Sequence, residues 1–69
     1  MAEILEINGP ILTIRLHQVV IGEQVRVGKL GLVGEVIGRK DDCATVQVYE
    51  ATDGLRPGDG ARPGLLRPR

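Results

Sequence analysis

Short runs in which apolar and polar side chains alternate set the strongest limit on how this chain can fold. Residues 11–16 (ILTIRL) and 44–50 (ATVQVYE) place an apolar side chain at every second position. This period of two is typical of a β-strand with one face against a core. β-branched residues dominate the apolar positions, and ten glycines and four prolines are spread along the chain, which disfavours helices. The sequence therefore predicts an all-β chain.

Five such runs are separated by residues that favour turns, among them NGP (8–10) and KDDC (40–43). The predicted strands cover residues 3–8, 11–16, 24–27, 32–39 and 44–50. The side chains expected to face the core from the strands at 11–16, 24–27 and 44–50 are Leu12, Ile14, Leu16, Val25, Val27, Ala44, Val46 and Val48. In the first strand, alternation places Ile4 with Glu6 on one side and Leu5 with Ile7 on the other. Short strands joined by turns indicate a small antiparallel barrel or sandwich.

Length, charge and composition exclude several classes of protein. The 69 residues allow one domain with a thin core. The formal net charge is zero and Tyr49 is the only aromatic residue, so neither the basic face nor the stacking surface of a nucleic-acid-binding protein is expected. No run approaches the roughly 20 apolar residues of a membrane span. With one cysteine and no signal-peptide pattern, we expect a cytoplasmic, reducing location and no insertion into a membrane.

The glycine-rich segment 27–40 (VGKLGLVGEVIGRK) has a superficial likeness to a phosphate-binding loop. That loop requires G-x-x-x-x-G-K-[ST]. Here Gly34 and Gly38 are one residue too close, Arg39 replaces the lysine, and Glu35 would put a carboxylate among the phosphates. We therefore interpret these glycines as positions that let a small sheet bend and form bulges.

Residues 25–59 (VRVGKLGLVGEVIGRKDDCATVQVYEATDGLRPGD), preceded by INGPIL at 7–12, resemble the N-terminal β-barrel of the catalytic A subunit of vacuolar/archaeal-type rotary ATPases. The resemblance covers about residues 4–59 and implies a closed or partly open Greek-key antiparallel barrel of about six strands. In that family, six barrels from two subunit types form a crown that holds the hexamer together. The family's phosphate loop, catalytic carboxylate and arginine finger lie in other domains, so none of these roles can be assigned to this chain.

The last residues depart from the family pattern. After PGD (57–59) the family continues with an alternating strand, whereas residues 61–69 (ARPGLLRPR) do not alternate and contain two prolines, which remove ladder donors. We therefore expect a barrel domain over residues 1–60 and an irregular tail over 61–69. A sheet that lacks its last strand keeps an unpaired edge, which favours oligomerisation.

The chemistry-bearing residues do not form a convincing catalytic, cofactor or metal site. His17 is the only histidine and serine is absent, so no serine triad can form. Cys43 follows Asp42, whose carboxylate raises a thiol pKa and lowers its reactivity. The remaining aspartates have turn spacing and lack the pattern of a calcium loop. We expect no enzyme activity from this chain alone and no cofactor.

Outward-facing apolar and aromatic residues are the better candidates for a functional surface. Tyr supplies a large contact area with a polar tip, so Tyr49 is a candidate interface anchor. The full set of interface candidates is Tyr49, Gln47, Ile37, Val33 and Ile11.

Two functions from different classes remain open. The first is a non-catalytic oligomerisation barrel of rotary ATPase type, in a homo-oligomer or a hetero-oligomeric ring with other ATPase subunits. The second is a repurposed stand-alone module that binds a protein or nucleic acid through its open edge or the loop at 51–60.

Overall fold

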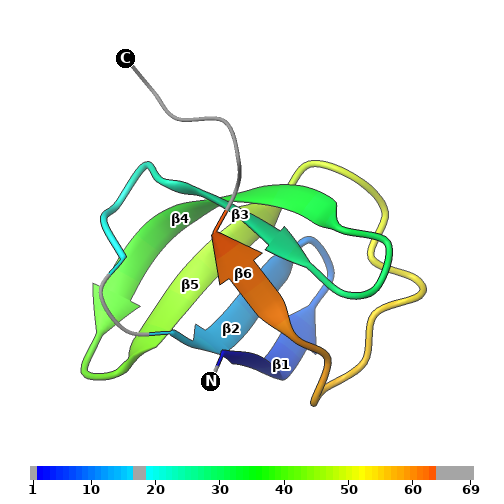
Figure 1. The fold of residues 1–69 in the computed structure, drawn as a ribbon, viewed down its shortest axis with the longest axis horizontal. Helices are drawn as coiled ribbons and strands as arrows, with labels where there is room; N and C mark the ends of the chain where they lie inside the picture. The colour runs from blue at the N-terminus through cyan, green and yellow to red at the C-terminus, as the bar shows by residue number, and fades with distance from the viewer. Residues whose placement is uncertain (1, 17–18, 64–69) are drawn as a thin grey trace.

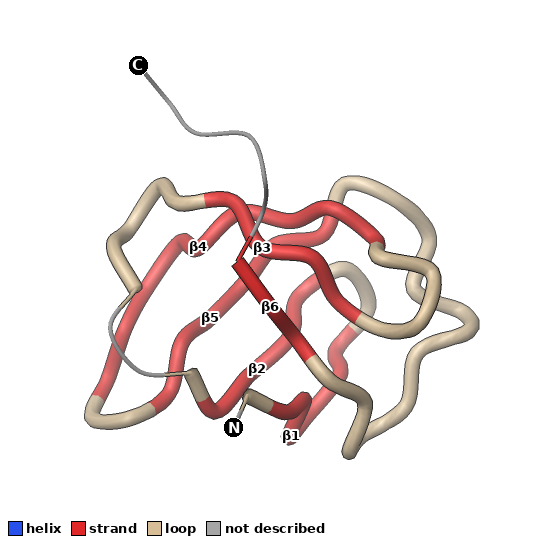
Figure 2. Tube along the Cα trace, viewed as in Figure 1, coloured by secondary structure: helices blue, strands red, loops and turns tan. Residues whose placement is uncertain are grey.

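The computed structural model describes residues 2–16 and 19–63, and strands account for most of that length (Figure 2). These two ranges hold six strands in chain order: β1 (Glu3–Asn8), β2 (Ile11–Arg15), β3 (Gln24–Val27), β4 (Leu32–Lys40), β5 (Cys43–Val48) and β6 (Ala61–Pro63). The described part of the chain contains no helix, and thus none that could span a membrane. The predicted all-β class is confirmed.

The strands form one antiparallel sheet in the order β1-β2-β5-β4-β3-β6. β3, β4 and β5 are consecutive neighbours, and β6 returns through the long 49–60 connection to lie beside β3. Three neighbouring strands with a fourth returning beside the first make a Greek key, as the resemblance implied. The sheet curls on itself, so that β6 lies in front of β2 and β5 in the view of Figure 1.

Backbone hydrogen bonds join the two ends of the sheet. The Ile4 N–H donates to the Asp59 carbonyl at 2.8 Å, and the Gly58 N–H donates to the Ile4 carbonyl at 2.7 Å. An antiparallel bridge pairs Glu3 with Gly60. These contacts supply hydrogen-bond partners to some of the backbone groups at the edge of β1, which would otherwise be open to pairing with another chain. The barrel is thus partly closed, by the segment that leads into β6.

Among the described residues, ten apolar side chains form the core: Ile4, Leu12, Ile14, Val19, Val25, Val27, Val36, Ala44, Val46 and Val48. Seven of the inward-facing residues expected from alternation are in this buried set, and Leu16 packs against it. The paired positions explain the match, because residues directly opposite each other share one face of the sheet. Leu12 lies opposite Val46, and Ile14 lies between Ile4 and Ala44.

Strand β1 departs from the expected alternation at Leu5. A register shift between Ile4 and Glu6 leaves Leu5 as an extra residue. Ile4 then lies opposite Ile14, while Ile7 lies opposite Leu12 and also packs against the core. The expectation that Ile4 shares its face with Glu6 and not with Ile7 was therefore wrong, because a bulge shifts the phase of alternation by one residue.

The two glycines of β4 have the bending role predicted for them. A Cβ added to Gly34 would lie 2.7 Å from Val46 Cγ1 and 2.9 Å from the Gln47 carbonyl oxygen, so β4 approaches β5 too closely for any larger residue. A register shift between Val36 and Gly38 leaves Ile37 as the extra residue of a second bulge. β4 is a ladder strand that pairs with β3 over residues 32–35 and with β5 over residues 34–40, which is incompatible with a loop that wraps phosphates.

The segment expected to be irregular begins with a strand. Residues 61–63 pair with β3, with Val25 opposite Pro63 and Val27 opposite Ala61. Proline is tolerated here because β6 is an edge strand that needs donors toward one side only. The remaining residues of the expected tail, 64–69, lie outside the described residues.

The close approach at Gly34 predicts a large difference between two glycine substitutions. We expect Gly34→Ala to lower the free energy of unfolding by about 1–3 kcal/mol, since the added methyl forces β4 away from β5. A Cβ on Gly54 would meet nothing within 4 Å and its φ is not in the left-handed region, so Gly54→Ala should change stability by less than about 0.5 kcal/mol. Urea unfolding followed by far-UV circular dichroism measures both. Equal stability of the two variants would contradict the proposed contact.

Candidate functional site

The outward side of the sheet carries a row of side chains that runs across three strands. Ile11 of β2 lies opposite Gln47 of β5, and Gln47 lies opposite Glu35 of β4. Because opposite residues point to the same side of a sheet, these three side chains are neighbours. Gln47 is exposed, whereas Ile11 and Glu35 are half-buried.

Tyr49 lies just beyond β5 and is tied to β4 at both its backbone and its side chain. Its N–H donates to the Val33 carbonyl at 3.0 Å, and its hydroxyl donates to Glu35 Oε1 at 2.8 Å. The pKa of the Tyr49 phenol is raised, first by this hydrogen bond and then by desolvation and the charge of Glu35. Tyr49 is nevertheless 58% exposed. The phenol is therefore held in one orientation with much of its ring open to a partner.

Ile37 extends this surface along β4. It is the extra residue of the β4 bulge and is 44% exposed. The neighbouring loop is joined to the same part of β4, since the Gly22 N–H donates to the Val36 carbonyl at 2.7 Å. We call the set of Ile11, Val33, Glu35, Ile37, Gln47 and Tyr49 the outer strip.

The outer strip contains all five predicted interface candidates together with Glu35. Ile11 and Val33 are half-buried and lie outside the core cluster. Sequence reasoning missed Glu35 as the partner of Tyr49, because the register that brings the two together depends on the bulge at Ile37 and not on the turn alone. It also missed the exposed Val20 and Ile21 in the loop before β3, whose only signal is a β-branched pair outside an alternating run.

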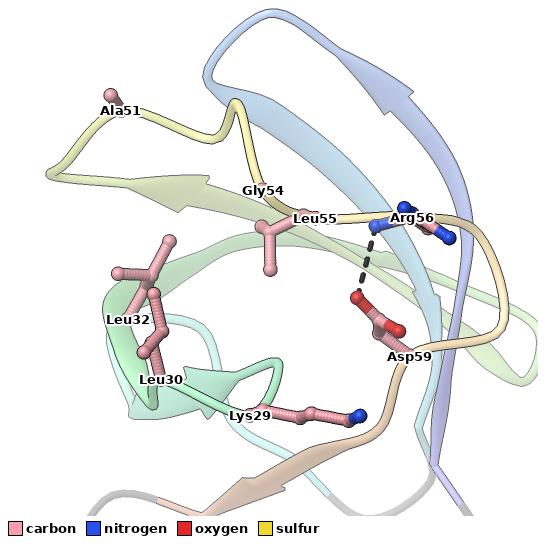
Figure 3. A pocket seen from close by; sticks show the side chains of 8 residues that line it. All are labelled: Lys29, Leu30, Leu32, Ala51, Gly54, Leu55, Arg56 and Asp59. Carbon is pink, nitrogen blue, oxygen red and sulfur yellow. Dashed lines mark hydrogen bonds between the residues drawn. The ribbon is translucent and has the colours of Figure 1, made fainter.

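A second candidate surface is a hollow of about 450 Å³ at one end of the barrel (Figure 3). It lies between the turn that joins β3 to β4 and the 49–60 connection. Its lining consists of Lys29, Leu30, Leu32, Ala51, Gly54, Leu55, Arg56 and Asp59. Leu55 points into the hollow (Figure 3), and a Cβ on Gly28 would collide with Leu55 Cδ2.

Turn formation, as predicted, accounts for the carboxylate in this hollow. The Asp59 carboxylate accepts a hydrogen bond from the Arg56 backbone N–H at 3.0 Å, and the Asp59 N–H donates to the Arg56 carbonyl at 3.1 Å. The same pattern occurs one turn earlier, where the Leu55 N–H donates to the Thr52 carbonyl. The hollow thus offers an apolar wall and two cationic side chains, without a free carboxylate poised for acid–base chemistry.

The other chemistry-bearing residues are not brought together. Burial raises the pKa of the Cys43 thiol, and the charge of Asp42 and the hydrogen bond to its carboxylate raise this pKa further, so the expected direction of the shift is correct. His17 lies outside the described residues. Within residues 2–16 and 19–63, no group of three or more His, Cys, Asp or Glu side chains is placed to hold a metal ion.

Known proteins show the same barrel as a small part of a much longer chain. The family described as ATP synthase alpha/beta family, beta-barrel domain, matches residues 4–63. The V-type ATP synthase alpha chain of Nitrosococcus oceani is 59% identical over 59 residues, which are 86% of this chain and 10% of that protein. The V-type ATP synthase alpha chain of Streptococcus pneumoniae (strain Hungary19A-6) is 43% identical over 58 residues, or 83% of this chain and 10% of that protein.

A solved structure of the assembled ATPase EscN, from the type III secretion system of enteropathogenic E. coli, has a TM-score of 0.85 at 23% identity. The matched region covers 93% of this chain and 16% of the EscN chain, and at this identity the match shows a shared fold only. The chain spans about a tenth of the length of the curated relatives. The match over residues 4–63 and the identity to these relatives establish that this chain belongs to the ATP synthase alpha/beta family, as its β-barrel domain.

Proposed function

We propose that this barrel is a non-catalytic scaffold of a vacuolar/archaeal-type rotary ATPase, where it packs against neighbouring barrels in a ring. The observation that carries the proposal is the outer strip, in which Tyr49 is hydrogen-bonded to Glu35 and Val33 and exposed apolar area continues along β4 at Ile37. A cytoplasmic position at the periphery of a membrane complex belongs to the same proposal and rests on the resemblance to the catalytic A subunit.

The contacts of the strip suit an interface between folded domains. Tyr49 is held by two hydrogen bonds to β4, so it loses little conformational entropy when a partner covers it. Ile37 adds exposed apolar area farther along β4, beyond the Glu35–Gln47 pair, and Gln47 gives the strip a polar group at its centre. A fixed aromatic residue with apolar neighbours and polar groups around them is the usual anatomy of a contact hot spot.

A second candidate function is a stand-alone binding module that uses the hollow at the end of the barrel. Leu30, which is 85% exposed, lies at this hollow together with Lys29 and Arg56. An apolar residue beside two cations suits an acidic peptide with an apolar anchor. Such a module would contact its partner through the 51–60 loop and leave the outer strip exposed. Substitutions in the loop and in the strip can therefore distinguish the two functions.

Co-assembly with the β-barrel of the B subunit of an A-type ATP synthase separates the two functions. We expect a mixed complex by sedimentation velocity. Ile37→Asn should weaken it about tenfold by placing an amide in an apolar contact. Leu30→Asn is the matched control, an exposed aliphatic residue outside the strip, and should have no effect. The reverse ranking would favour the binding module, and a wild-type chain that stays monomeric in the mixture would refute the ring.

Nucleotide binding can be tested on the chain alone. Isothermal titration of the chain with Mg-ATP should give no binding heat, because Gly34 and Gly38 lie in a paired strand and not in a loop whose amides wrap phosphates. Saturable binding at one site per chain would overturn both proposed functions.

The raised pKa of Tyr49 predicts a distinct pH dependence. As the only tyrosine in a chain without tryptophan, Tyr49 can be titrated by absorbance near 295 nm. The midpoint should lie above the ordinary value of 10.0 and return toward it in Glu35→Gln. Because the pKa of Tyr49 is higher in the folded state than in the unfolded state, the protonated phenol stabilises the folded chain. This contribution to the free energy of unfolding is complete below pH 10 and is lost as the pH rises through the folded-state pKa. An identical midpoint in wild type and Glu35→Gln would exclude the hydrogen bond in solution.

A further inference from the structure

Two arginines lie directly opposite each other on the outward side of the sheet. Arg26 of β3 pairs with Arg62 of β6, and on its other side Arg26 pairs with Val33. Like charges at directly opposite positions repel and destabilise a sheet. Because Val33 accepts the backbone hydrogen bond of Tyr49, the arginine pair continues the outer strip toward β6.

The hydrogen bonds of the pair go to neutral groups. Arg26 Nη1 donates to the Gly31 carbonyl at 3.4 Å, and Arg62 Nη1 donates to the Gly28 carbonyl at 3.2 Å. Arg26 Nε is enclosed and has no partner. Within the described part of the chain, no carboxylate accepts a hydrogen bond from either guanidinium. An enclosed N–H without an acceptor costs free energy, so this arrangement does not stabilise the isolated barrel.

The turn between β3 and β4 lets both guanidinium groups approach one point. Gly31 has a φ of 68°, a conformation that favours glycine. A Cβ on Gly31 would lie 3.0 Å from Arg62 Nη2 and 3.9 Å from Arg26 Nη1. Two positive groups therefore converge beside a residue that has no side chain.

We propose that Arg26 and Arg62 form a carboxylate-binding site, filled by an Asp or Glu side chain of a neighbouring barrel. This inference rests on the proposed ring, because it names the chemistry of the partner that covers the outer strip. A partner that buries Tyr49 and Val33 also approaches the adjoining arginines. Burying unpaired guanidinium groups is costly unless the partner supplies an opposite charge. A carboxylate matches guanidinium geometry and accepts two hydrogen bonds at once.

Glutarate, a free dicarboxylate, tests the site on the chain without a protein partner. We expect saturable shifts of the Gly28 and Gly31 amide resonances in NMR spectra, with binding weakened about tenfold in Arg62→Gln by loss of a charge-assisted hydrogen bond. Arg39→Gln removes the same charge from an exposed position elsewhere on the sheet and should leave binding unchanged. Absence of saturable shifts in wild type, or equal weakening by both substitutions, would overturn the site. Binding of inorganic phosphate about tenfold or more tighter than glutarate would also overturn the site as a carboxylate site. A tenfold difference in affinity is about what one hydrogen bond to a charged group contributes.

Co-assembly with the barrel of the B subunit then tests the occupant. Arg62→Gln should weaken the complex about tenfold and reduce its salt dependence, while Arg39→Gln does neither. A complex that forms equally well with Arg62→Gln would overturn the inference and leave the ring intact. If wild type binds glutarate at the arginines yet forms no complex, the ring and the assigned occupant are refuted and the carboxylate site is supported.

Discussion

The closure of this barrel depends on the close contact between β4 and β5 at Gly34. Val46 and the Gln47 carbonyl occupy the space that a side chain at this position would need. Among the described residues the core consists of ten aliphatic side chains, so the sheet must curl tightly to exclude water from it. Glycine in β4 and the bulges at Leu5 and Ile37 provide that curvature.

The same curvature determines what the outer surface presents. Ile37, the extra residue of the β4 bulge, lies on the outward side because Gly34 and Val36 face the core, and it is 44% exposed. The tight β4–β5 pairing brings Tyr49 within hydrogen-bond distance of Glu35, and the Greek-key return of β6 places Arg62 against Arg26. Core packing and the proposed interface are therefore two sides of one sheet, and a change that loosens the curl is expected to disturb both.

Much of the fold could be predicted because strand formation here is a local property. Alternation identified five strands and most of the core, and glycine spacing indicated bending rather than phosphate binding. The bulge at Leu5 could not be predicted, since it depends on how β1 meets β2 when the barrel closes. Strand β6 was missed because Pro63 within it and Pro68 after it in the sequence weaken any local strand signal, while the edge position of β6 makes Pro63 acceptable. Tyr49 stood out from its chemistry alone, whereas the Arg26–Arg62 pair depends on a contact between distant segments that only the topology supplies.

The central claim is that neighbouring barrels cover the outward face of β4 and β5. Site-specific photo-crosslinking in the mixed complex tests it most directly, with a benzophenone side chain at Gln47 in the middle of the outer strip. We expect a cross-link to the neighbouring barrel from position 47 and none from Glu6, an exposed position on β1. Efficient cross-linking from position 6 with none from position 47 would contradict the claim.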